Sequence, residues 1–375
     1  MKKVTILVLH LRHGGIEKQT VTLANELCKN YEVNIISTYS LKREPAYSLD
    51  SRIKVKYLID DSPNKEEFHK ALHSKNVFKI LKEGFFSLKI LYLKRHLMKR
   101  EIKKLDCDFV ISSRIEFAAL LSRFAPKNIS KISVEHNFDQ TPKYVSRVKK
   151  AFKGIDKLVV LSSKAEENYR NWLKDNKKIQ IVRIANMLPL IPEEKCLLGG
   201  KRLLAVGRLH KIKNFKAAIN VLYHLKKVIP DATLTIVGDG EEREMLEKTA
   251  DELNLKDSVF FEGMVSEEKV LELMLCSDIL LVTSLSEAFP MVLLEAGSVG
   301  LPSIVFDVPS GMGDIIKDSY NGYMLPPFDT ETAAKRAAFL LKNREKLNEM
   351  GKNAAQNALK FKPENIKPYW NDILN

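Results

Sequence analysis

Two glutamates, Glu287 and Glu295, frame a segment whose residue types suit a phosphate ester attached to sugars. The segment follows an apolar run of strand length at 279–282 and a polar turn, and Pro290 is expected to be the first residue of a helix. The first amides of a helix have no partner within it and lie at the positive end of its dipole, so they bind phosphate. The amides expected to be free are those of Met291, Val292 and Leu293.

The two carboxylates suit different hydroxyl groups. Glu295 lies three residues beyond Val292 on the same helix face, where a carboxylate can accept hydrogen bonds from both hydroxyls of a ribose. Glu287 lies in the loop before the helix, near the expected place of a sugar on the second phosphate. Helix capping would explain either acid alone, but the pair around a helix that starts at proline favours binding.

Cations for a diphosphate are found after another strand-like run, at 203–206. Gly207 allows a sharp turn at the strand end, Arg208 offers a planar fork for two phosphate oxygens, and Lys213 adds a point charge. In a transfer reaction these two cations would stabilise negative charge on a leaving diphosphate.

The N-terminal half contributes weaker candidates. Gly14 and Gly15 join the first strand-like run to a helical segment, so their amides can approach a phosphate or sugar closely, and Glu17 in the first turn is a possible cap. His136 ends the run at 132–135, a position that suits either a structural or a functional histidine.

Other motifs are interpreted as structural. Asp106-Cys107-Asp108 resembles a metal-binding acid pair but leads directly into a strand, which favours a turn. Gly238-Asp239-Gly240 is first of all a turn, and residues 311–314 are interpreted as a helix entry without chemistry. No metal site is expected.

Strand-like and helix-like segments alternate along the whole chain, which is typical of parallel sheets with crossover helices. The expected strands are 4–9, 33–37, 53–58, 109–112, 132–135, 158–162, 179–184, 203–206, 233–237, 259–261, 279–282 and 303–306. The expected helices include 16–29, 215–228, 241–253, 267–275 and 290–299. Prolines and a glycine pair interrupt the alternation at 188–200, which predicts a linker between two α/β domains.

The charge is unevenly distributed along the 375 residues. The formal net charge is +14 overall, but residues 1–190 carry +18 and residues 191–375 carry −4. Segment 65–104 holds twelve Lys and Arg against four Glu, interleaved with aromatic and aliphatic residues. This pattern fits a solvated helix with one buried face, a segment on an anionic membrane surface, or a nucleic-acid contact.

Composition excludes several classes of protein. No run of eighteen apolar residues suggests a membrane span, and the apolar run at 4–9 is too short for a signal peptide. The four cysteines are far apart and predict neither a zinc site nor a disulfide framework, so a cytoplasmic location is expected.

Together these motifs resemble the family 4 retaining glycosyltransferases, which have the two-domain GT-B architecture. The resemblance covers nearly the whole chain. The motifs that carry it are Gly14-Gly15-x-Glu17, Gly207-Arg208-Leu209 with Lys213, Val237-Gly238-Asp239-Gly240, Phe261-Glu262-Gly263, Glu287-x7-Glu295 and Asn321-Gly322.

The resemblance implies two Rossmann-like domains with an interdomain cleft, an acceptor-side domain at 1–187 joined by a C-terminal helix at 363–375, and a nucleotide-sugar domain at 188–362. It implies that Arg208 and Lys213 hold the diphosphate, that Glu295 binds the ribose and Glu287 the donor sugar, and that His136 touches that sugar. The amides of Phe289–Leu293, Pro290 included, would contact sugar and phosphate, and residues near Val265 would flank the base.

The implied reaction transfers a hexose or N-acetylhexosamine, with a UDP-sugar favoured as donor, with retention of configuration and without a metal or other cofactor. The implied acceptor is a lipid-linked saccharide of bacterial surface polysaccharide synthesis, reached from the inner face of the membrane through the basic 65–104 segment. A nucleotide-sugar epimerase or hydrolase and a non-enzymatic basic binding protein remain as alternatives. No nucleic-acid recognition motif appears.

Overall fold

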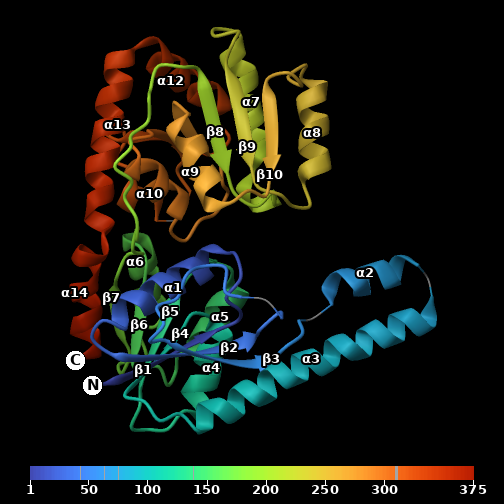
Figure 1. Ribbon diagram of the computed structural model, residues 1–375, viewed down its shortest axis with the longest axis vertical. Helices are drawn as coiled ribbons and strands as arrows, with labels where there is room; N and C mark the ends of the chain where they lie inside the picture. The colour runs from blue at the N-terminus through green and yellow to red at the C-terminus, as the bar shows by residue number, and fades with distance from the viewer. Residues whose placement is uncertain (43, 63, 75, 138, 309–310) are drawn as a thin grey trace. The chain divides into compact units, whose positions relative to one another are not determined.

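The computed structural model describes residues 1–375 apart from 43, 63, 75, 138, 309 and 310 (Figure 1). The chain divides into two compact units. Unit one consists of Met1–Val160, Asn168–Ile184 and Tyr369–Asn375, and unit two consists of Leu161–Glu167 and Ala185–Pro368.

Unit one is built on a seven-stranded sheet in the order β3-β2-β1-β4-β5-β6-β7, in which every neighbouring pair is parallel. The strands are β1 Lys3–Val8, β2 Glu32–Tyr39, β3 Lys54–Ile59, β4 Phe109–Ser112, β5 Ser130–Glu135, β6 Lys157–Val160 and β7 Gln180–Arg183. The helices in this part of the chain are α1 Gly15–Leu27, α2 Lys65–His73, α3 Val77–Lys103, α4 Ile115–Phe124, α5 Pro142–Ala151 and α6 Ser163–Trp172.

Unit two has a six-stranded parallel sheet in the order β10-β9-β8-β11-β12-β13. The strands are β8 Arg202–Val206, β9 Thr233–Val237, β10 Val259–Gly263, β11 Ile279–Val282, β12 Ser303–Phe306 and β13 Gly322–Leu325. The helical elements in this part of the chain are η1 Lys211–Lys213, α7 Phe215–Lys226, α8 Arg243–Glu252, α9 Glu267–Leu275, α10 Met291–Ser298, α11 Met312–Ile315, α12 Thr330–Lys342, α13 Arg344–Ala358, η2 Leu359–Phe361 and α14 Pro363–Leu374, the last of which ends in unit one.

The predicted two-sheet α/β fold is confirmed. Strands β4, β9, β11 and β12 and helix α9 have the predicted bounds, and the other predicted strands differ by a few residues at their ends. Residues 188–200 contain no helix or strand, as the proline and glycine pattern predicted. Strand β13 and helices α12 and α13 were not predicted from the sequence, although Asn321-Gly322 at the start of β13 is one of the motifs that carry the family resemblance.

The basic segment forms two helices, α2 and α3, and α3 projects beyond the sheet of unit one (Figure 1). One face of α3 is buried, since Ile90 belongs to a core cluster with Tyr39 and Ile59, and Phe86, Leu93 and Leu97 pack against that cluster. A different face is exposed and apolar. We call it the α3 stripe, and its members are Phe78, Leu81, Phe85, Leu88 and Tyr92, each at least 65% exposed.

Within the described residues, every helix is either too short or too polar to cross a bilayer. The end of α14 is fixed to unit one: Trp370, Ile373 and Leu374 are buried, and Lys2 Nζ donates to the carbonyl of Leu374 at 3.3 Å.

The order of the strands in both sheets predicts where ligands bind. In each sheet the strand order reverses beside the first strand, between β1 and β4 in unit one and between β8 and β11 in unit two. Loops on either side of such a reversal leave room at the carboxyl edge of the sheet, which is where open α/β sheets bind ligands. The candidate site residues are therefore expected in these loops.

The strand-end loops of unit two are packed so closely that one of them requires glycine. Gly238 follows β9 with φ of 126°, and a Cβ there would lie 2.0 Å from the carbonyl oxygen of Gly207. A side chain would therefore force apart the β8 and β9 loops.

We predict that Gly238→Ala lowers the free energy of unfolding by about 3 kcal/mol, because strain at a positive φ adds to a backbone clash. The matched control is Gly313→Ala, where a Cβ would meet no described atom within 4 Å. Urea unfolding of both variants measures the difference, and equal midpoints would contradict this account of the loop.

Candidate functional site

The unit-two site begins at the turn after β8. The amide of Gly207 donates to Val237 O at 2.9 Å, which holds the turn against β9. Arg208 follows with an exposed side chain, and its guanidinium makes no ion pair with any described residue. Leu209 is buried beneath it, so the backbone of the turn is anchored while the arginine reaches solvent. An exposed, unpaired guanidinium at this edge is available to an anion.

The turn continues into η1, whose last residue pairs with the loop after β11. Lys213 Nζ lies 2.5 Å from Glu287 Oε1, and the Ser284 hydroxyl donates to the same oxygen at 2.7 Å. Backbone contacts join the same two loops, since Leu285 N donates to Ile212 O at 2.7 Å. The structure therefore brings together Lys213 and Glu287, which are 74 residues apart, at the reversal of strand order.

The helix that follows differs in two details from the prediction. Pro290 is the N-cap of α10 with ψ of 103°, so the helix begins one residue later, at Met291. The amide of Leu293 is not free, because it donates to Pro290 O at 3.1 Å in a tight first turn. The amides of Met291 and Val292 make no hydrogen bond within the described part of the chain. Two amides rather than three are therefore available to a ligand at the start of this helix.

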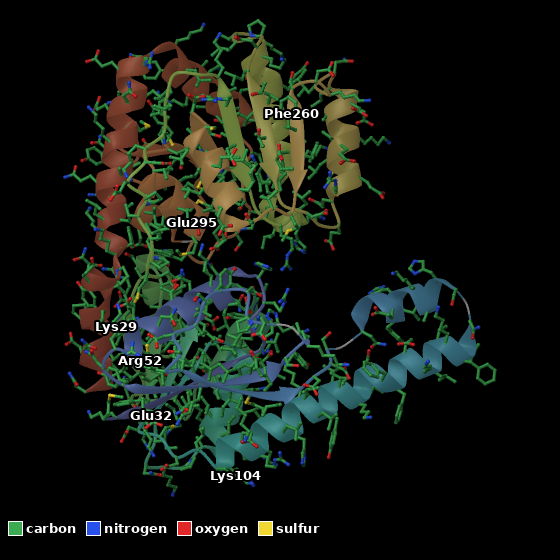
Figure 2. The ribbon with its side chains drawn as sticks, viewed as in Figure 1. Lys29, Glu32, Arg52, Lys104, Phe260 and Glu295 are labelled. Carbon is green, nitrogen blue, oxygen red and sulfur yellow. The ribbon has the colours of Figure 1, made fainter. Side chains whose placement is uncertain are left out.

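Glu295 lies one turn further along α10 and is half-buried. Figure 2 shows it on the side of unit two to which the β8, β9 and β10 arrows point. The ring of the buried Phe289 packs edge-on against Phe361, with centroids 5.8 Å apart, and this fixes the loop before the helix. Val265 lies in the loop after β10, an edge strand two places from β8.

The unit-one site lies at the corresponding reversal of strand order. Gly14 is the N-cap of α1, and a Cβ there would lie 2.2 Å from Glu17 Oε2, so glycine makes room for this carboxylate. Glu17 is buried and is not a cap: its Oε1 accepts from Arg114 Nη2 at 3.1 Å, with His10 Nδ1 at 3.7 Å. A Cβ on Gly15 would meet nothing within 4 Å of the described residues.

Arg114 is the residue that sequence reasoning missed. It is the N-cap of α4, on the far side of the reversal from Gly14, and its Nε is buried without a hydrogen-bond partner among the described residues. The only signal in the sequence was its position just after the strand at 109–112, because 97 residues separate it from Glu17.

His136 lies directly after β5 and is half-buried. Burial and the nearby positive charge of Arg114 lower the pKa of His136 to about 4, so its imidazole is neutral at pH 7. The preceding Glu135 fixes this turn, since its Oε1 accepts from Asn137 N at 2.9 Å. Burial raises the pKa of Glu135. A neutral imidazole at a strand end is suited to hydrogen-bond a sugar hydroxyl.

The structural interpretation of the acidic motif is confirmed. Asp106 pairs with Lys3 Nζ at 2.7 Å, and Asp108 accepts from Lys3 N at 2.7 Å, so both hold the turn before β4. Among the described residues, no group of three or more His, Cys, Asp or Glu side chains is placed to hold a metal ion. Gly311 is the N-cap of α11, while Pro309 and Ser310 lie outside the described residues.

We predict a pH-dependent loss of stability that His136 controls. The histidine titrates near 6.5 when unfolded and near 4 when folded, so the unfolded chain binds the proton more tightly. Stability is therefore lost as the pH falls from about 6.5 towards 4, by about 2 kcal/mol from this site. In unfolding experiments across this pH range, His136→Gln should lose about 2 kcal/mol less of its free energy of unfolding than the wild type. The control His69→Gln, at an exposed position, should lose as much as the wild type. Parallel curves for the wild type and His136→Gln would contradict the assignment.

Known proteins are similar to this chain over part or all of its length. Residues 193–357, which include Arg208, Lys213, Glu287 and Glu295, match the family model described as Glycosyl transferases group 1. The whole chain is 28% identical over 389 residues to the amylovoran biosynthesis glycosyltransferase AmsD of Erwinia amylovora, and the match covers all of both chains.

Two further relatives differ in how much of their length is matched. An alpha-1,4-N-acetyl-D-galactosaminyltransferase of Campylobacter jejuni, named for a diNAcBac-PP-undecaprenol acceptor, is 28% identical over 378 residues, covering all of this chain and 98% of that protein. An exopolysaccharide phosphotransferase of Streptomyces coelicolor is 26% identical over 390 residues, but this chain spans only 40% of its length.

Solved structures share the fold. The crystal structure of TarM superposes with a TM-score of 0.80 at 16% identity, covering 100% of this chain and 99% of that one. The pneumococcal O-GlcNAc transferase GtfA, solved with UDP and GlcNAc, gives 0.76 at 16% identity and covers 100% and 98%. Two parallel α/β units, a matching family model and full-length glycosyltransferase relatives lead to one conclusion: residues 193–357 form a glycosyltransferase group 1 domain, and the chain is a glycosyltransferase of the GT-B fold.

Proposed function

We propose that this glycosyltransferase moves a hexose or N-acetylhexosamine from a nucleotide-diphosphate sugar, with UDP favoured, to a lipid-linked saccharide acceptor in bacterial surface polysaccharide synthesis. The observation that carries the proposal is the exposed, unpaired Arg208 beside the Lys213–Glu287 pair, where the strand order of unit two reverses. Two cations and two unpaired amides, those of Met291 and Val292, suit a diphosphate.

Lys213 is held in place before any donor binds. Its partner Glu287 is 12% exposed, and Lys213 itself is 27% exposed, so both charges are only partly solvated. A diphosphate can share this lysine with the carboxylate, whose remaining lone pairs then accept hydrogen bonds from the hydroxyls of the donor sugar. Glu295, one turn into α10, is placed for the ribose in this arrangement.

We propose that the transfer retains the anomeric configuration. The bond between the anomeric carbon and the diphosphate oxygen breaks, a bond to the acceptor oxygen forms on the same face, and the proton of the acceptor passes to the leaving diphosphate. Arg208 and Lys213 stabilise the charge on that leaving group. A product with inverted anomeric configuration in an NMR assay would contradict retention.

The proposed preference for UDP and the proposed class of acceptor are supported by the names and titles of similar proteins. The structures of GtfA and of a TarM variant were solved with UDP, and the Campylobacter relative is named for an undecaprenol-linked diphosphate acceptor. The relative from Erwinia is named for biosynthesis of amylovoran. These names support the proposal for this chain, whose residues 1–190 carry a net charge of +18.

We further propose that unit one docks on the membrane that carries the acceptor. The α3 stripe exposes Phe85 and Leu88 to solvent at 73% and 68%, on a helix that also carries eight Lys and Arg residues. A helix with one apolar face and abundant cations lies at the interface of an anionic bilayer.

The donor site is tested by calorimetric titration of UDP, GDP and ADP in EDTA. We expect one nucleotide to bind without metal, and Arg208→Ala and Glu295→Ala each to weaken binding about tenfold or more, since each removes a charged hydrogen-bond partner. The control is Lys256→Ala, an exposed cation in the loop before β10, at the opposite edge of the sheet. Failure of the folded protein to bind any nucleotide, or binding that needs a divalent metal, would contradict the proposal.

Membrane docking is tested by sedimentation with anionic vesicles at moderate salt. Phe85→Ser with Leu88→Ser should weaken binding by about tenfold or more, because each apolar side chain withdrawn from water contributes about 1.5 kcal/mol or more. Leu190→Ser with Leu197→Ser is the matched control, since both leucines are similarly exposed, at 66% and 84%, but lie in unit two. A wild type that ignores the vesicles, or equal losses in both variants, would refute docking through α3.

A further inference from the structure

Unit one contains a second candidate site, away from the loops at the reversal of strand order. It is a groove of about 1100 Å³ between α4 and α5, bordered by Lys94 and Arg95 of α3. We call it the α4–α5 groove. Its walls extend over the whole length of both helices, from Ile115 to Phe124 on one side and from Lys143 to Gly154 on the other.

The two walls are regular helix faces. Residues three and four apart share one face of a helix, and the groove is lined at that spacing on both sides. The α4 face consists of Glu116, Ala119, Leu120 and Arg123, and the α5 face consists of Lys143, Ser146, Arg147 and Lys150. Tyr144 and Val148 of α5 are buried and do not line the groove, so the core holds the cationic face of this helix outward.

The charge of the groove is strongly unbalanced. Seven Lys and Arg side chains line it, and Glu116 is its only acid among the described residues. That acid is shared, since Glu116 lies 2.6 Å from Lys94 Nζ and 3.6 Å from Arg147 Nη2. The other five cations make no ion pair with a described residue. They are Arg95, Arg123, Lys143, Lys150 and Lys153.

One of these cations lies where it destabilises its own helix. Lys143 lies in the first turn of α5, where the helix dipole is positive, and this turn contains no acidic residue. Cations are unfavourable at that end of a helix, and five like charges along one groove repel one another. A bound anion would remove both penalties, which are otherwise unexplained by the packing of unit one.

The position of the groove indicates where the anion comes from. Lys94 and Arg95 follow Tyr92, the last member of the α3 stripe, so the groove begins where the apolar face of this helix ends. A chain docked through the stripe would hold these cations at the boundary between lipid and water, where phosphate groups of lipids lie. The helices α4 and α5, whose faces form the groove, start at the same sheet edge as His136.

From this juxtaposition we propose that the α4–α5 groove binds the diphosphate of the lipid-linked acceptor. The proposal rests on the acceptor class proposed above and assigns the group that unit one recognises in it. A diphosphate concentrates more charge in one place than a single phospholipid headgroup, and clustered Lys and Arg side chains match it. Arg123 and Lys150, from opposite walls, are the contacts expected to contribute most.

The test compares binding to two kinds of vesicle made from a neutral host lipid. One kind contains a polyprenyl diphosphate and the other contains phosphatidylglycerol, in amounts that give both the same surface charge. The wild type should prefer the diphosphate vesicles by about tenfold or more. Arg123→Gln with Lys150→Gln should abolish the preference, while residual binding through the α3 stripe remains. The control, Lys177→Gln with Lys178→Gln, removes the same charge from exposed positions of unit one outside the groove and should keep the preference.

Three results would overturn the proposal. Equal binding to both kinds of vesicle would show a general attraction to anionic lipids, and loss of the preference in the control as well would show an effect of net charge. Tight binding of duplex DNA that only the groove variant loses would assign the groove to nucleic acid. Nucleotide titration of the same variants separates the two proposals, because a groove variant that still binds UDP leaves the donor site intact.

Discussion

A parallel sheet whose strand order reverses beside its first strand leaves adjoining loops at its carboxyl edge, and both units of this chain depend on that constraint. In unit two the reversal places the loop after β8 beside the loop after β11, which joins Lys213 to Glu287. In unit one it places the start of α1 beside the start of α4, which joins Glu17 to Arg114. Each edge thus contains one ion pair formed between residues far apart in the sequence, and each pair fixes the loops that a ligand would contact.

The two sheet edges differ in the chemical group that each presents to a ligand. At the unit-one edge, Glu17 is buried beneath Gly14. Burial and the charge of Arg114, the partner of Glu17, lower the pKa of His136, so this edge presents a neutral imidazole. At the unit-two edge, Lys213 is paired but Arg208 is exposed without an ion pair among the described residues, so this edge presents positive charge. A neutral hydrogen-bonding group suits a sugar, and exposed cations suit a diphosphate. The difference follows from local burial and pairing, since both sheets have the same order of their first strands.

Much of this arrangement could be predicted from short-range sequence patterns. Alternating apolar runs locate most of the strands, and Gly207-Arg208 and the Glu287–Glu295 segment follow two of those strands directly. Contacts between distant residues could not be predicted, because a single sequence does not state which loops become neighbours. The pairing of Glu17 with Arg114 and the α4–α5 groove both depend on how helices pack. The predicted start of α10 was wrong by one residue, because Pro290 has an extended ψ and its carbonyl accepts a hydrogen bond from the amide of Leu293.

The central claim is that Lys213 binds the second phosphate of a nucleotide, and one comparison of affinities tests it most directly. Dissociation constants would be measured for the preferred nucleoside diphosphate and for its monophosphate, with the wild type and with Lys213→Ala. We predict that the wild type binds the diphosphate about tenfold or more tightly than the monophosphate, and that Lys213→Ala removes most of this difference while its affinity for the monophosphate stays unchanged. If Lys213→Ala weakens both nucleotides equally, or neither, the lysine does not contact the second phosphate and the account of the donor site is wrong.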